Sequence, residues 1–140
     1  MLTTTEHIVS DVFEDEFVFC CLLDGHIFYS YNKPGTICDD SVMKSIFSHY
    51  EKLSTERPLK IIAEMGLHSS MSRQAREFLQ EHTKLAVCEA AVIHSLAQRM
   101  LINFYHSFKK HQHPSKVFKS SENALSWVKT FQEVEIHNSH

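Results

Sequence analysis

The chain has 140 residues, the size of one domain, and its 43% hydrophobic and 22% charged residues exclude an intrinsically disordered protein. The formal net charge of −3 argues against nucleic acid as a partner, because binding to phosphates requires clustered Lys and Arg. No apolar run approaches the ~20 residues of a membrane span, and residues 1–17 lack the pattern of an export signal, so we expect a soluble, cytoplasmic protein.

The cysteines and histidines show no metal-binding or redox pattern. None of the four cysteines (Cys20, Cys21, Cys38 and Cys88) belongs to a Cys-x-x-Cys pair, and none of the 11 histidines forms the spaced pair with a glutamate that marks a zinc helix. We therefore expect buried, reduced thiols that pack as small apolar groups, with no bound metal and no cofactor.

The chain opens with a polar, acidic segment over residues 1–16, which we expect to be a lead-in that adds at most one short edge strand. Residues 17–31 (FVFCCLLDGHIFYSY) then predict a β-hairpin. The turn signal is Asp24-Gly25, a dipeptide that tolerates the positive φ angles required at both central positions of a type I′ turn.

A two-residue hairpin loop pairs Leu23 with His26 and leaves apolar side chains on both faces of the hairpin. The second face must therefore be covered by the chain's own helices, by a second subunit or by a ligand. The candidate dimer or ligand face comprises Phe19, Cys21 and Phe28.

Two αβ steps follow the hairpin. Residues 39–53 predict an amphipathic helix that begins at an acidic cap. Residues 59–65 (LKIIAEM) are a short, continuous apolar run, typical of a strand that is buried on both faces. After Gly66, the serines of residues 68–72 (HSSMS) offer caps for a second helix.

The last part of the chain repeats this alternation. Residues 90–94 (AAVIH) predict a strand, and Ser95 caps a long amphipathic helix. A short strand at residues 116–118 and a final helix capped by Ser120 complete the pattern.

This order of elements predicts an α/β fold with a mixed, four- to five-stranded sheet that opens with a β-hairpin. Right-handed crossovers should place the helices mainly on one face of that sheet. We assign residues 1–16 to the lead-in, residues 17–132 to a single domain and residues 133–140 to a flexible tail.

The sequence offers little for catalysis. Its three glycines cannot build a dinucleotide-binding turn or a P-loop. Glu64, His68 and Cys88 could converge at the carboxyl ends of the strands, but nothing in their spacing requires it. We therefore expect a protein that is not an enzyme, with a Cys/His-dependent enzyme as the less favoured interpretation.

The order of elements, the strand-serine-helix unit HSLAQRMLINFYHSF and the ending PSKVFKSSENALSWVKTF resemble small bacterial STAS-domain proteins. These form the SpoIIAA-like group, which is related to anti-sigma-factor antagonists, and the chain is most similar to its uncharacterised, single-domain branch. The resemblance covers residues 17–131, and its motifs mark the fold rather than a chemistry.

The resemblance implies a regulatory site. STAS antagonists carry a phosphorylatable Ser or Thr at the start of the helix after the central strand, and that helix docks on a partner kinase. The matching serines are Ser69, Ser70 and Ser72, although the same serines can instead cap the helix. The matching partner-binding positions are Glu64, His68, Arg73 and Arg76.

We therefore expect a non-catalytic, protein-binding regulatory module in signalling, which binds an unidentified protein and forms a homodimer. The alternative is a carrier of a small hydrophobic ligand, such as an acyl chain or a lipid, because the apolar hairpin face could line a pocket.

Overall fold

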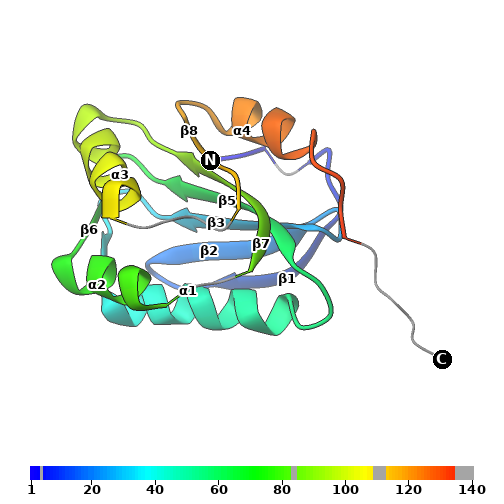
Figure 1. Cartoon of the computed structure of the whole chain (residues 1–140), viewed down its shortest axis with the longest axis horizontal. Helices are drawn as coiled ribbons and strands as arrows, with labels where there is room; N and C mark the ends of the chain where they lie inside the picture. Colours follow the sequence, from blue (N-terminus) through cyan, green and yellow to red (C-terminus); the bar gives the residue numbers. More distant parts are fainter. Residues whose placement is uncertain (4, 83–84, 109–112, 135–140) are drawn as a thin grey trace.

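The structure is a computed structural model that describes residues 1–3, 5–82, 85–108 and 113–134 (Figure 1). Its strands and helices alternate along the chain after an initial run of three antiparallel strands. The elements are β1 (Val9–Glu14), β2 (Val18–Leu23), β3 (Ile27–Asn32), β4 (Ile37–Cys38), α1 (Asp40–Leu53), β5 (Leu59–Met65), β6 (Ser70–Met71), α2 (Arg73–Glu81), β7 (Ala86–Val92), α3 (Leu96–Phe108), β8 (Ser115–Phe118) and α4 (Ser121–Val128).

The main sheet of the described chain has six strands in the order β1-β2-β3-β5-β7-β8. Strands β1, β2 and β3 pair antiparallel, while β3, β5, β7 and β8 run parallel. The predicted mixed α/β sheet is therefore present, but the predicted count of four to five strands is wrong. The additional strand is β1, which lies in the predicted lead-in of residues 1–16. As an edge strand it pairs only with β2, and its Phe13 packs against the core.

The hairpin turn has the predicted conformation but not the predicted register. Asp24 and Gly25 have φ angles of 51° and 77°. However, Leu23 pairs with Ile27 rather than with His26, so the loop has three residues. Because side chains alternate along a strand, this shift of one residue exchanges the two faces of β3 relative to β2.

The candidate hairpin face is consequently split between two cores. Phe19 and Cys21 pack on one side of the sheet, and Phe28 packs on the other. Both sides are covered by the same chain, so the hairpin presents no open apolar face to a second subunit.

Three helices lie on one face of the sheet and the fourth lies on the other. Figure 1 shows α1 and α2 below the sheet and α4 above it. Helices α1, α2 and α3 each connect two neighbouring parallel strands, so right-handed crossovers put them on the same side. Helix α4 follows the last strand and is free of that constraint, so it lies on the opposite face from the other three.

Each face of the sheet has its own buried cluster. The α4 side packs Leu2, Cys21, Leu23, Ile27, Tyr29, Ile62, Cys88, Ala90, Val92, Ala124 and Val128. The opposite side packs Val18, Cys20, Phe28, Cys38, Val42, Met43, Tyr50, Leu59, Ile61, Ala75 and Leu79. Strand β5 contributes to both clusters, as its continuous apolar run predicts.

The helix caps confirm the predicted starts. The Asp39 carboxylate accepts the Val42 N–H at 2.9 Å, and the Ser120 hydroxyl accepts the Asn123 N–H at 3.1 Å. None of the helices in the described ranges is long and apolar enough to cross a membrane. Residues 135–140 of the predicted tail (residues 133–140) lie outside the described residues. Val134 belongs to the same segment, and its carbonyl oxygen accepts a hydrogen bond from the Arg57 side chain at 2.9 Å.

Replacing Gly66 by alanine should destabilise the fold by about 3 kcal/mol, because the new Cβ would collide with backbone atoms. It would lie 2.3 Å from the Asn32 carbonyl oxygen and 2.9 Å from the Pro34 nitrogen. Urea unfolding followed by circular dichroism measures this loss.

The matched control is Gly35→Ala, where nothing lies within 4 Å of the added Cβ and only the φ of 74° opposes the change. That strain should cost about 1 kcal/mol. Equal losses at the two glycines would show that the close approach at Gly66 is unimportant.

Candidate functional site

A carboxylate is buried near the carboxyl end of the central strand β5. Glu64 is only 2% exposed. Its Oε1 accepts the Tyr29 hydroxyl hydrogen at 2.6 Å, and its Oε2 lies 2.7 Å from His94 Nε2 and 3.4 Å from the N-terminal amino group of Met1. The Tyr29 oxygen in turn accepts the Leu2 N–H at 3.1 Å. Both carboxylate oxygens therefore have partners, as a buried charge requires.

Neighbouring strands bring these groups together. Tyr29 lies on β3, which pairs in parallel with β5, and its hydroxyl reaches Glu64 across the same face. His94 stands two residues beyond the end of β7, which is the other neighbour of β5. Because parallel strands end at the same edge, the two loops and their side chains meet there.

Burial also governs the phenols beside Glu64. It raises the pKa of Tyr29, and the hydrogen bond to Glu64 raises it further, so the phenol stays neutral and acts as a donor. Burial and the Glu64 charge likewise raise the pKa of Tyr31. Tyr29 and Glu64 can thus hold and orient the His94 imidazole at the surface.

Gln98 holds the loops around this carboxylate in place. Its Oε1 accepts the His94 N–H at 2.7 Å, while its Nε2 donates to the carbonyl oxygens of Gly66 at 2.9 Å and Ser69 at 3.0 Å. One buried amide therefore connects the start of α3 with the segment that leads into α2. The Ser95 hydroxyl accepts the Gln98 N–H at 3.1 Å, as a helix cap does.

The sequence analysis did not identify Tyr29, His94 or Gln98 as site residues. A usable signal existed for His94, since it lies between a strand and a helix cap, where a parallel sheet collects polar groups. Nothing in the sequence pairs it with Glu64, which lies 30 residues earlier.

The three predicted serines occupy different environments. Ser69 is buried, with its hydroxyl 3.5 Å from Gln98 Nε2. Ser70 is half-buried in β6, and Ser72 is the α2 cap that accepts the Ala75 N–H at 3.1 Å. Of the three, Ser70 combines partial exposure with a hydroxyl that is not used to cap α2.

The predicted partner-binding residues also differ in their exposure to solvent. Glu64 is buried and cannot contact a partner surface directly, which corrects that expectation. His68 is exposed with a φ of 61°. Arg73 is exposed and pairs with Glu77 at 2.9 Å, and Arg76 donates to the Met71 carbonyl oxygen at 3.0 Å.

The hypothetical catalytic combination of Glu64, His68 and Cys88 is not assembled. Cys88 pairs with Lys60 near the start of β5, about four residues or ~13 Å along the sheet from Glu64. Burial raises the pKa of the Cys88 thiol to about 11, so it is a poor nucleophile. Within the described residues, no group of three His, Cys, Asp or Glu side chains could hold a metal ion.

A second feature lies between the sheet and the helices α1, α2 and α3. It is a cavity of about 90 Å³ with mostly apolar walls. Asn32 also lines it, and its Oδ1 is buried without a hydrogen-bond partner. Representative apolar lining residues are Phe28, Met43, Phe47, Ile61, Ala63 and Ala91.

Comparison with known protein families matches residues 20–132 to a domain of unknown function, DUF7793. The chain belongs to the DUF7793 family. No curated protein and no solved structure matches it. The DUF7793 match includes β2 from Cys20 onward and all of β3, β5, β7 and β8, together with Glu64, His94 and Gln98.

Glu64→Gln and Tyr29→Phe should each destabilise the domain by about 1–3 kcal/mol, because each leaves a buried polar partner unsatisfied. The double variant should lose about 1 kcal/mol less than the sum, since both changes remove the same hydrogen bond. Urea unfolding of the four proteins measures this coupling.

Glu77→Gln is the control, because its ion pair with Arg73 is exposed. It should change the free energy of unfolding by less than about 0.5 kcal/mol. Strictly additive losses at Glu64 and Tyr29 would contradict the shared hydrogen bond.

Proposed function

We propose that this DUF7793 domain is a non-catalytic protein-binding module whose partner docks at the carboxyl end of the sheet. The observation that carries the proposal is a group of four large apolar side chains at that end, each between 51% and 73% exposed. They are Ile37, Leu67, Leu96 and Met100, and we call them the apical apolar group.

The topology explains why these side chains share one end of the molecule. Leu67 directly follows β5, and its carbonyl oxygen accepts the Gly35 N–H at 2.9 Å, beside Ile37. Strand β4, which contains Ile37, pairs with β6 just before α2. Leu96 follows β7 and lies one turn from Met100 on α3.

Exposed apolar side chains of this size favour burial against another protein, at ~1.5–3 kcal/mol for each one fully covered. His68 and Arg73 add polar groups beside them, as at the rim of an interface. The resemblance to STAS antagonists supports the same location, since their partners dock at the start of the corresponding helix.

Regulation by phosphorylation belongs to the same proposal, with Ser70 as the acceptor. Ser70 is partly exposed and lies next to Ile37 in the β4-β6 pair. A phosphate there would add about two negative charges beside an apolar docking surface and would weaken or redirect binding. Self-association is also proposed, but it must use a surface other than the hairpin faces, which are covered.

The variant Leu96→Asp/Met100→Asp should weaken binding of the native partner at least about tenfold, because each aspartate places a charge in the buried interface. Affinity purification from the source organism identifies the partner, and calorimetry with the purified partner then measures Kd for both proteins.

Ile8→Asp/Val12→Asp is the matched control, since both residues are exposed and apolar but belong to the N-terminal segment and β1. It should bind as the wild type does. Loss of binding in the control, or full binding by the α3 variant, would contradict docking at the carboxyl end.

A second candidate function is the binding of a small apolar ligand in the 90 Å³ cavity. The specific observation is the buried Asn32 Oδ1, which has no hydrogen-bond partner among the described residues and lies in a mostly apolar wall. An unsatisfied buried acceptor costs ~1–3 kcal/mol, so a ligand that donates one hydrogen bond to it gains affinity. The apolar remainder of such a ligand would contact the side chains of the helices.

This second function predicts that 1-hexanol binds about tenfold more tightly than its isomer methyl pentyl ether, which has no donor. Titrations followed by NMR measure both affinities. Ala63→Leu fills the cavity and should abolish binding, whereas Ala97→Leu makes the same change on the exposed side of α3 and should not. Equal affinities for the two isomers would exclude Asn32 as the acceptor.

A further inference from the structure

A separate hollow of about 370 Å³, lined by both polar and apolar side chains, opens beyond the ends of β7 and β8. Its walls come from two loops and the first turn of α3, which the parallel strands bring to one edge. The lining residues are Ile93, His94, Ser95, Leu96, Arg99 and Lys119.

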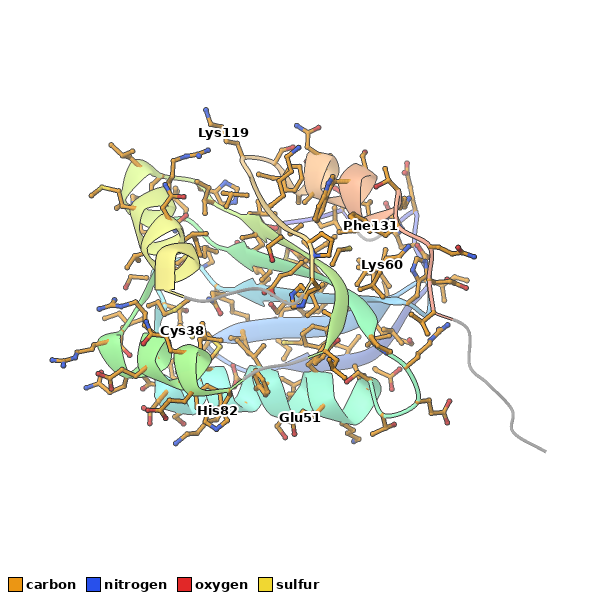
Figure 2. The ribbon with its side chains drawn as sticks, in the orientation of Figure 1. Cys38, Glu51, Lys60, His82, Lys119 and Phe131 are labelled. Carbon is orange, nitrogen blue, oxygen red and sulfur yellow. The ribbon has the colours of Figure 1, made fainter. Side chains whose placement is uncertain are left out.

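Two cations line this hollow without a counter-charge. Within the described part of the chain, the side chains of Arg99 and Lys119 have no ion pair or hydrogen bond, although the Arg99 backbone N–H donates to the Ser95 carbonyl oxygen at 3.0 Å. Other basic side chains do have partners, as Lys33 has with Glu14 at 2.7 Å. Figure 2 shows Lys119 extending away from the ribbon in the loop between β8 and α4.

Two unpaired cations beside one hollow are notable in a chain whose net charge is −3. None of the described residues that line the hollow is an Asp or Glu, so an anion bound there would neutralise both cations. A ligand with about two negative charges matches them in number.

The third polar group is the His94 imidazole, whose position is fixed by two hydrogen bonds to buried side chains. Its Nε2 lies 2.7 Å from the buried Glu64 carboxylate, and its backbone N–H donates to Gln98 at 2.7 Å. A carboxylate only accepts hydrogen bonds, so Nε2 carries the hydrogen. Among the described residues, Nδ1 makes no further hydrogen bond, which leaves it available to a ligand.

We propose that this hollow binds a small phosphate monoester. Arg99 and Lys119 supply the charge for its phosphate, Ile93 and Leu96 contact its organic group, and the Nδ1 of the anchored His94 can accept a hydrogen from a hydroxyl of that organic group. The hollow shares Leu96 with the apical apolar group, but its ligand is a small molecule and its test needs no other protein, so the two proposals can fail separately.

The test titrates the whole chain with inorganic phosphate and with phenyl phosphate at constant ionic strength, followed by NMR of the backbone amides. We expect saturable shifts at residues 93–96 and 119, with a Kd of ~1 mM for phenyl phosphate. Inorganic phosphate should bind more weakly, because it has no group to contact Ile93 and Leu96.

Arg99→Gln/Lys119→Gln should weaken phenyl phosphate binding about tenfold or more, because it removes both positive charges that line the hollow. The matched control is Lys44→Gln/Lys52→Gln, which removes the same charge from exposed positions on α1. It should change Kd less than about twofold. Lys119→Gln alone, at an exposed loop position, tests the site should the double variant fail to fold.

Three results would overturn the proposal. The first is the absence of saturable shifts in the wild type, and the second is an equal loss of affinity in the control, which would indicate a general charge effect. The third is equal affinity for inorganic phosphate and phenyl phosphate, which would exclude a monoester as the preferred ligand.

Discussion

The Glu64 carboxylate is almost completely buried, and a buried charge is costly unless its oxygens are hydrogen-bonded. Tyr29, His94 and the N-terminal amino group meet this requirement from three separate parts of the chain. Satisfying one carboxylate therefore orders the N-terminus, the edge of β3 and the loop after β7 together. The arrangement at the carboxyl end of the sheet depends on these contacts.

Gln98 extends this order to the neighbouring loops. Through its hydrogen bonds to Gly66, Ser69 and His94, it connects the approach to α2 with the start of α3. Three members of the apical apolar group (Leu67, Leu96 and Met100) lie on these two segments, and so does the His94–Arg99 part of the hollow. A rigid, hydrogen-bonded base under exposed side chains is what a binding surface needs, because little conformational entropy is then lost on association. Both proposed sites consequently rest on the same buried support.

The apolar cavity is organised differently. It lies on the face covered by α1, α2 and α3, whereas the Glu64 hydrogen bonds lie on the face covered by α4. The two regions lie mainly on opposite sides of the sheet and meet at β5, where Glu64 also lines the cavity. A ligand in the cavity and a partner at the carboxyl end could thus be accommodated by different layers of one small domain.

Local features of this fold could be predicted from the sequence, because they depend on contacts between near neighbours. The caps Asp39 and Ser120, the buried strand β5 and the Asp24-Gly25 turn all belong to this class. The mixed sheet also followed from the order of elements. The one-residue hairpin shift did not, because local turn chemistry is similar in both registers, whereas burial on two faces distinguishes them. The Glu64 contacts depend on which strands become neighbours, and only the tertiary structure decides that, since pairing is set by packing over the whole sheet rather than by adjacent residues.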